Sequence, residues 1–418
     1  MAGGVFRLEL APPETLGRRL QYALLSLSED AEVDPYAGHA VFPSAGSYVE
    51  LVEEALEALR PLELQAGAAG RRCDGARVRG FDCCRLHRGP SLYSAGRRGT
   101  VGGARYAGDY LALAQAGLAR CPYTTSQGKQ TLAWVHAAVS YADLVLERGA
   151  PLGGSASELP WLAKATLFGK LRAPGGGRRP RSGGWGSLDT LGSILLGGSL
   201  AFLGSQRLGK QGGSAEFLLV PDAPHPGYAV LRDLLLAGGV SSSAPVRAAR
   251  LASDYPVSLE VALAVELASE LASRLGPASE AAYLLEAARL ESAATLVTVS
   301  PQQRPLVRGS LPLTTIVYRA FRPGSVRLLL RLARLARGAA AQKALQGLRD
   351  LVGGCVNSVF LQAMAGRWGD HLAGCVRGLT AAAQQARRKR LEELAGVMEA
   401  LASSLAGDYR ALARGARA

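Results

Sequence analysis

The stretch Ala294-Thr-Leu-Val-Thr-Val-Ser-Pro-Gln-Gln-Arg304-Pro-Leu-Val-Arg308-Gly309 decides the fold class of this 418-residue chain. Apolar and β-branched residues fill Thr295–Val299, and a proline-bounded turn at Pro301–Pro305 follows, as is typical of a strand and its turn. We expect a second strand at Thr314–Tyr318. Segments on both sides show helical periodicity, so this β interlude, at about 294–319, lies within a mainly helical region.

The flanking segments repeat apolar residues on one helical face. In Ser258–Leu275 these include Leu259, Leu263 and Leu267, which recur at intervals of four residues. Further helices are predicted at Ala278–Ala288, Val326–Leu335, Gln342–Leu361 and Arg387–Leu405. Residues 226–418 therefore read as a mainly helical C-terminal domain, with the later helices forming a bundle.

The first half of the chain mixes strands and helices. Strands are predicted at Val5–Leu10 and Glu216–Val220, and a helix follows Pro12 and Pro13 to about Leu27. Apolar spacing predicts more helices at Ser47–Leu59, Tyr106–Ala119 and Thr131–Glu147. The predicted fold class is α+β, with a mixed domain over 1–225 that carries basic loops at 71–105 and 160–213.

These two stretches carry the whole positive excess of the chain, which has a formal net charge of +14. Residues 71–105 hold nine arginines and two aspartates, and residues 160–213 hold eight Lys or Arg and one aspartate. Both are rich in glycine and lack helical periodicity, so we expect exposed loops. Basic loops on a neutral body are typical of nucleic-acid binding, although a solvated insertion without a partner has the same composition.

Several cations outside these loops extend the candidate interface. Arg327, Arg331 and Arg334 recur at i, i+4 and i+7, which places them in one stripe that either faces solvent or contacts a nucleic-acid strand. Lys129 follows a polar turn at Tyr123–Gly128 that could hold a phosphate or simply cap a helix. The run Arg387–Arg390 reads as a solvated or partner-facing helix start. The full set of candidate nucleic-acid-binding residues is Arg97, Arg98, Arg105, Lys129, Lys164, Lys170, Arg172, Arg178, Arg179, Arg181, Arg207, Lys210, Arg327, Arg331 and Arg334.

The segment Gly204-Ser-Gln-Arg-Leu-Gly209-Lys210-Gln211 is one residue away from a phosphate-binding P-loop. Gln211 stands where a Ser or Thr hydroxyl would hold magnesium, and a strand-like segment follows instead of a helix. We therefore expect Lys210 and Arg207 to contact phosphate from a basic loop, without nucleotide hydrolysis.

Cysteines and one histidine of the first basic stretch could bind zinc, since thiolates and imidazole suit that ion. The spacing lacks a paired C-x2-C knuckle, so a disulfide and unlinked thiols stay open as alternatives. Cys355 and Cys375 lie on apolar helical segments, and we expect them to be buried small hydrophobic residues. The candidate zinc ligands are Cys73, Cys83, Cys84, His87 and Cys121, and we expect no other cofactor.

No nucleophile elbow, carboxylate pair or HExxH motif is present, which argues against an enzyme. Met1–Glu9 lacks the charged and apolar regions of a signal peptide. Leu188–Leu203, the nearest approach to an apolar span, is too short and too polar to cross a bilayer. We expect a soluble, cytoplasmic protein without a membrane partner.

The overall plan and the segment Ala294–Gly309, set between helices, resemble the large subunit of archaeal type I-A CRISPR interference (Cascade) complexes. Members of that family have a strand-and-helix N-terminal domain, basic insertions and a helical C-terminal part, and some carry paired C-x2-C knuckles that this chain lacks. The resemblance covers about the last 200 positions diffusely.

The resemblance implies a non-catalytic DNA- and RNA-binding subunit of a ribonucleoprotein complex in antiviral defence. It would contact guide RNA and target double-stranded DNA, inspect the short duplex motif beside the target and help to open the strands. Its partners would be the backbone and small subunits of the complex and a helicase-nuclease effector, which cuts. The alternatives are a general RNA-binding ribonucleoprotein scaffold and an enzyme that processes a nucleotide or nucleic acid through Lys210.

Overall fold

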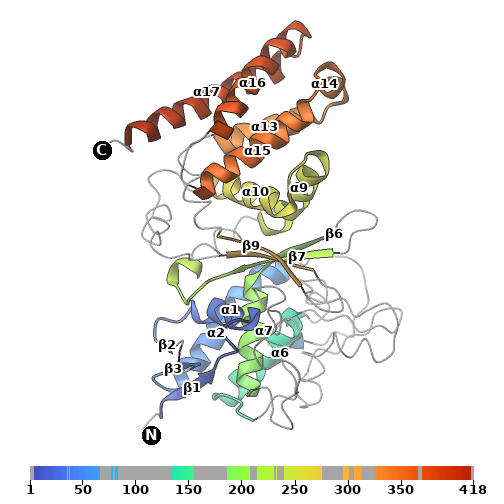
Figure 1. The fold of residues 1–418 in the computed structure, drawn as a ribbon. Coiled ribbons are helices and arrows are strands. Elements are labelled where there is room, and N and C mark those ends of the chain that lie inside the picture. The colour runs from blue at the N-terminus through green and yellow to red at the C-terminus, as the bar shows by residue number, and fades with distance from the viewer. Residues whose placement is uncertain are drawn as a thin grey trace, which may run out of the picture. The chain divides into compact units, whose positions relative to one another are not determined.

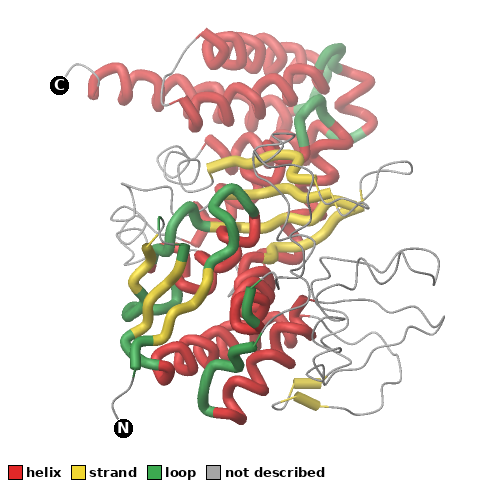
Figure 2. The backbone as a smooth tube through the Cα atoms, turned by 60° about the horizontal axis from the view of Figure 1, so that its bottom comes forward, coloured by secondary structure: helices red, strands yellow, loops and turns green. Residues whose placement is uncertain are grey.

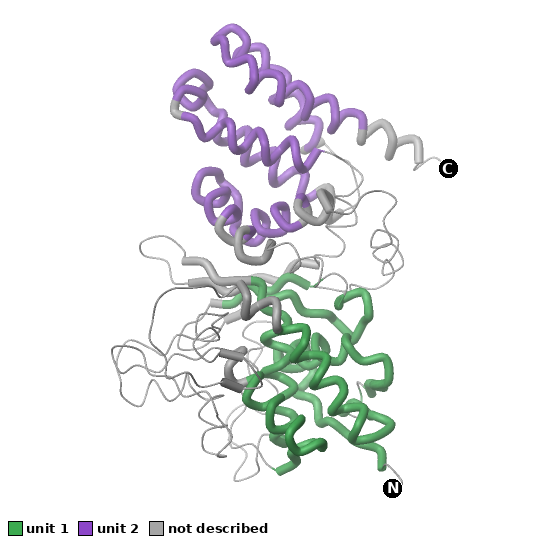
Figure 3. Tube along the Cα trace, turned by 180° about the vertical axis from the view of Figure 1, so that it is seen from behind, with its two compact units in different colours: residues 1–239, 293–310 green, residues 240–292, 311–418 purple. Residues whose placement is uncertain are grey.

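The chain folds into two compact units, residues 1–239 with 293–310 (unit 1) and residues 240–292 with 311–418 (unit 2) (Figure 3). The computed structural model describes residues 4–34, 36, 38–65, 77–78, 81–82, 134–154, 186–207, 214–229, 232, 240–274, 295–300, 306–312, 325–365 and 370–415. The fold is mixed α+β, with small sheets and a helical C-terminal region.

Unit 1 contains two larger sheets and four described helices (Figure 1). In the first sheet, of order β1-β3-β2, the strands lie side by side and pair antiparallel, with Phe6 opposite Phe42 (Figure 2). The second sheet has the order β6-β7-β8-β9. The elements are β1 (Phe6–Glu9), α1 (Leu16–Leu25), β2 (Glu32–Asp34), β3 (His39–Phe42), α2 (Ala45–Gln65), β4 (Arg77–Val78), β5 (Phe81–Asp82), α6 (Trp134–Arg148), α7 (Leu188–Ala201), β6 (Phe202–Arg207), β7 (Ser214–Val220), β8 (Thr295–Ser300) and β9 (Leu306–Pro312).

Helix α7 is the centre of unit 1, where it contacts α1, α2 and α6. Every residue from Asp189 to Ala201 is buried. This corrects the expectation that the whole stretch 160–213 is an exposed loop, because its residues 188–207 form α7 and β6. A helix that is apolar on all sides has no polar face, so its sequence shows little helical periodicity.

The N-terminus of α7 is held by a buried polar network. Asp189, 2% exposed, accepts hydrogen bonds from the Tyr141 hydroxyl at 2.7 Å and from the backbone N–H groups of Leu152 and Gly153 at 3.0 and 2.8 Å. Tyr48 and Tyr141 share a further hydrogen bond of 2.6 Å. Burial raises the pKa of Tyr141, and the neighbouring Tyr48 and Asp189 raise it further, so the phenol remains a proton donor. The network ties α2, α6 and the 151–154 loop to α7.

The β interlude contributes strands to the sheet of unit 1, whereas the sequence placed it within the mainly helical region. Strand β8 matches the predicted strand Thr295–Val299 and pairs antiparallel with β7, Glu216 lying opposite Val299 and Val220 opposite Thr295. The predicted strand Thr314–Tyr318 lies outside the described residues. An apolar run predicts that a strand forms but does not identify its partner, which here lies about 80 residues earlier.

Apart from the last two residues of β9, the described part of unit 2 consists of helices and their connections. The helices are α9 (Val240–Asp254), α10 (Leu259–Arg274), α13 (Ser325–Ala336), α14 (Ala339–Ala344), α15 (Leu348–Ala365), α16 (Asp370–Arg388) and α17 (Glu392–Gly415). The predicted helix Gln342–Leu361 is split, because α14 ends at Ala344 with Leu345 in an extended conformation, and Gly347, whose φ of 73° is left-handed, directly precedes α15. The predicted helix Arg387–Leu405 also differs, because its first residues end α16.

Cys355 and Cys375 join α15 to α16 by a disulfide across a Cα–Cα distance of 5.2 Å. Both are buried as expected, at 0% and 6% exposure, but the disulfide between them was not predicted. Each cysteine lies on an apolar helical face, and only the packing of α15 on α16 brings the two faces together.

No helix within the described ranges is long and apolar enough to cross a membrane.

Candidate nucleic-acid interface

Helix α13 exposes a stripe of arginines above a buried apolar face. Arg327, Arg331 and Arg334 are exposed, as their i, i+4 and i+7 spacing predicts. Leu329 and Leu332 on the other face are fully buried. The core of unit 2 thus fixes the direction in which the three guanidinium groups leave the helix, and we call them the α13 stripe.

Helix α17 packs against α13 in the opposite direction. Arg331 forms an ion pair of 3.1 Å with Glu393 near the start of α17, and Ser325 at the start of α13 contacts Ser404 farther along α17 at 2.9 Å. The Arg331 pair is open to solvent, with side-chain exposures of 59% and 65%, so it contributes at most about 1 kcal/mol to stability. Its main effect is to order Arg331 on the surface.

Four consecutive cations, Arg387 to Arg390, span the end of α16 and the turn that leads to α17, and we call this segment the basic turn. The N–H of Leu391 donates to the carbonyl of Ala386 and the N–H of Arg390 to the carbonyl of Arg387, which is the Schellman pattern of a helix end. Arg390 therefore has a φ of 57°, the left-handed conformation that glycine usually supplies at this position.

The basic turn lies at the end of unit 2 toward which α13 runs (Figure 1). Arg387 is neutralised by Glu399, to which it donates two hydrogen bonds of 2.9 and 2.7 Å. Arg388, Lys389, Arg390 and Arg334 are exposed and form no ion pair within the described part of the chain. Exposed guanidinium and ammonium groups at a helix end suit phosphate oxygens, since Arg in particular binds them bidentately.

We expect Arg390→Gly to stabilise unit 2. A left-handed backbone costs a residue with a side chain about 1–2 kcal/mol, which glycine avoids. Losing one cation near the C-terminus of α16 costs less, about 0.3–1 kcal/mol, so the conformational gain dominates. Chemical denaturation should show a higher free energy of unfolding, whereas an unchanged or lower value would mean that the Arg390 side chain stabilises the turn by a contact of its own.

Most of the predicted nucleic-acid-binding residues lie outside the described residues. For Arg207 the structure gives only the backbone, as the last residue of β6. The predicted zinc ligands also lie outside the described residues, and within the described ranges no three His, Cys, Asp or Glu side chains gather as a metal site would require. Those outside are Arg97, Arg98, Arg105, Lys129, Lys164, Lys170, Arg172, Arg178, Arg179, Arg181 and Lys210, together with Cys73, Cys83, Cys84, His87 and Cys121.

The fold argues against a P-loop at Gly204–Lys210, of which the structure describes Gly204–Arg207. Residues Gly204 to Arg207 belong to β6, which pairs antiparallel with β7, Ser205 lying opposite Glu216. A P-loop needs a curved backbone whose N–H groups surround a phosphate, and strand pairing commits this backbone to a ladder instead.

The sequence analysis singled out the basic turn but predicted that it begins a helix, whereas it ends α16. Its four cations are visible as a run, and the acidic residues that follow at Glu392 and Glu393 mark the true N-terminus of α17. The end of α16 could not be predicted from the sequence, because the usual sign of a helix end is a glycine and Arg390 occupies that position here.

Comparison with known proteins gives no relative: no family model, no curated protein and no solved structure matches this chain.

Proposed function

We propose that this protein is a non-catalytic nucleic-acid-binding subunit of an RNA-guided surveillance complex. The observation that supports it best is the exposed α13 stripe beside the basic turn, where cations are presented by ordered helices. The charge pattern adds to this, because residues 164–181 alone carry six cations and no carboxylate. A surface of this kind binds the phosphate backbone of DNA or RNA without reading the sequence.

The more specific role rests on the resemblance to archaeal type I-A large subunits. In such a complex base pairing between guide RNA and target reads the sequence, and the protein needs backbone contacts and a short local readout. The proposed ligands are guide RNA and target double-stranded DNA at the site of strand opening. The proposed partners are the backbone and small subunits and a helicase-nuclease, and the proposed compartment is the cytoplasm.

The first experiment measures binding of the full-length protein to labelled duplex DNA, single-stranded DNA and structured RNA across a salt series. The duplex carries a randomised short motif beside an unpaired bubble. We expect a steep salt dependence with a preference for certain motifs at the junction. Equal or tighter binding to RNA without a motif preference would instead support an RNA scaffold, and absence of binding at low salt would contradict the proposal.

The double variant Arg327→Gln/Arg334→Gln tests the α13 stripe. Each phosphate contact on duplex DNA contributes about 0.9 to the slope of log K against log salt, so the slope should become shallower by about 1.8. The matched control is Arg7→Gln/Arg377→Gln, which removes two exposed arginines from β1 and from the middle of α16. An equal change of slope in both variants would mean that net charge alone governs binding, and the stripe would have no specific role.

A further inference from the structure

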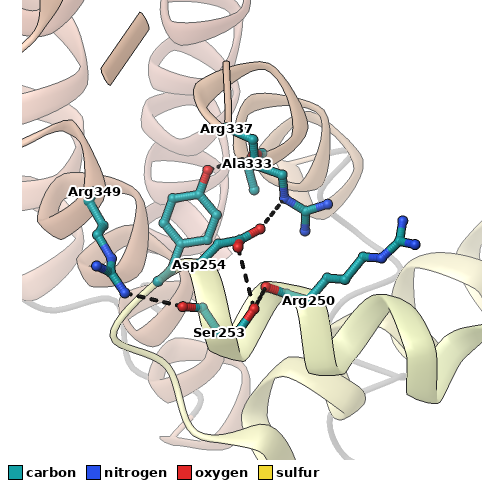
Figure 4. A network of polar contacts seen from close by, with 7 residues as sticks. Arg250, Ser253, Asp254, Ala333, Arg337 and Arg349 are labelled. Carbon is teal, nitrogen blue, oxygen red and sulfur yellow. Dashed lines mark hydrogen bonds and ion pairs between the residues drawn. The ribbon is translucent and has the colours of Figure 1, made fainter. Parts of the chain in front are cut away.

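Three arginines lie near the end of α9, and one of them, Arg337, contacts the carboxylate of Asp254 (Figure 4). Arg250 lies four residues before Asp254 and therefore on the same face of α9. Arg337 follows the last residue of α13, and Arg349 lies in the first turn of α15. We call Arg250, Asp254, Arg337 and Arg349 the Asp254 cluster. It contains three cations and one anion, so its net charge is positive.

Both oxygens of Asp254 are already used inside the cluster. Oδ2 lies 2.6 Å from Nε of Arg337, and Oδ1 accepts a hydrogen bond of 3.3 Å from the Ser253 hydroxyl. The side chains of Arg337 and Asp254 are 30% and 34% exposed. Nε of Arg337 is shielded from solvent, and its N–H is not aligned with a hydrogen-bond acceptor, so the contact with Asp254 is an ion pair by distance. Arg337 is thus held through its Nε atom, and its two Nη groups form no hydrogen bond or ion pair within the described residues.

The surrounding contacts make this end of α9 rigid. Arg349 donates from Nη2 to the carbonyl of Ser253 at 3.1 Å, and the Tyr255 hydroxyl donates to the carbonyl of Ala333 at 2.6 Å. Burial raises the pKa of Tyr255 to about 12, so the hydroxyl keeps its proton at neutral pH. Because Ala333 lies one turn before Arg337 on α13, the Tyr255 bond fixes the backbone from which Arg337 extends.

Arg250 is left without a carboxylate. It is exposed and forms no ion pair in the part of the chain that the structure describes, although an Asp four residues along its own helix would be the expected partner. Figure 4 shows Arg250 and Arg337 extending to the same side of Asp254, with Arg349 on the other side. Two guanidinium groups that share a side and lack a second anion can bind an oxyanion.

We propose that Arg250 and Arg337 form a binding site for a backbone phosphate of the nucleic acid that contacts the α13 stripe. Arg334, in the stripe, lies three residues before Arg337 and so next to it on α13. The site therefore extends the contact surface from α13 onto α9. Asp254 is a positioning residue, which holds Arg337 by Nε and leaves its Nη groups to the phosphate. This inference rests on the proposed function.

The experiment uses the full-length protein with labelled single-stranded and duplex DNA across a salt series. Arg250→Gln should make the salt slope shallower by about 0.9 on duplex DNA and about 0.7 on single strands. Arg377→Gln, which removes an exposed arginine from α16, should leave both slopes unchanged. Unfolding measured on the same variants should show no loss of stability for Arg250→Gln, since the structure gives its side chain no ion pair.

The variant Asp254→Asn tests whether Asp254 positions Arg337 or affects DNA binding only through its negative charge. The variant has one more net positive charge, so electrostatics alone would tighten DNA binding. If Asp254 positions Arg337, binding weakens in spite of the added charge. Tighter binding would overturn the positioning role.

The failures of the two proposals can be told apart. If wild-type protein binds no nucleic acid, or if the stripe variant behaves like its control, the proposed function fails. If the stripe variant loses slope and Arg250→Gln does not, only the Asp254 cluster is overturned. Inorganic phosphate at matched ionic strength is a further arm: stabilisation that depends on Arg250, together with unchanged DNA binding, would assign the site to free phosphate and overturn the backbone contact.

Discussion

Replacing Gly197 by alanine should lower the free energy of unfolding of unit 1 by about 3 kcal/mol or more. Gly197 lies in α7 where this helix crosses α1, and an added Cβ would overlap the backbone carbonyl oxygen of Leu20. A backbone atom cannot rotate away as a side chain can, so the two central helices would have to separate. Their separation would also disturb the buried hydrogen bond between Gln21 and Ser193.

Hydrogen exchange followed by mass spectrometry reports the stability of each unit separately. A single unfolding curve recorded on the whole two-unit chain would combine the two units. Peptides from α1 and α7 should lose protection, and peptides from α15 and α16 should keep theirs. The matched control is Gly396→Ala in α17, where an added Cβ meets no atom within 4 Å. There alanine should stabilise the helix by up to about 1 kcal/mol through its higher helix propensity. Normal protection of α1 in the Gly197 variant would show that the helices can separate at little cost.

Replacing Cys355 and Cys375 together by alanine should destabilise unit 2 by about 3 kcal/mol. The disulfide closes a loop with a sequence separation of 20 residues, and a loop of this size restricts the unfolded chain by about that amount. Because both residues are buried, the lost sulfur atoms also remove packing between α15 and α16. Chemical denaturation and the exchange of amides in these two helices both report the change.

The single variants supply the control for this prediction. Cys355→Ala and Cys375→Ala each break the same bond, so each should cost nearly as much as the double variant, and the two effects should not add. Additive effects would indicate two independent buried residues without a bond. The double variant is cleaner than a reductant, because it changes these two positions and nothing else.

Two helices with one apolar face could be predicted from the sequence with nearly their observed bounds. The predicted helices Thr131–Glu147 and Ser258–Leu275 correspond to α6 (Trp134–Arg148) and α10 (Leu259–Arg274). Helix α7 could not be predicted in this way, because its sequence is apolar on every side and rich in glycine and serine. The glycines that lower its helix propensity are needed for packing, since Gly192 meets the ring of Tyr141 and Gly197 meets the backbone of α1.

The features that depend on tertiary packing were not predicted. The sequence shows that β8 is a strand, that Cys355 is buried and that Arg337 is a cation, but not that they meet β7, Cys375 and Asp254. In the candidate site, the α13 stripe was predicted because helical spacing alone defines it. Arg250 was not, because its relation to Arg337 depends on how the end of α9 packs on α13.

The discontinuous course of unit 1 has a consequence for synthesis on the ribosome. Strand β7 ends at Val220, and its neighbour β8 begins only at Thr295, after a segment that belongs to unit 2. Until that strand has been translated, the side of β7 on which β8 pairs exposes unpaired backbone groups, which favour aggregation. Unit 1 therefore cannot finish folding before unit 2 begins to emerge, and the nascent chain is most vulnerable while residues 221–300 are being made.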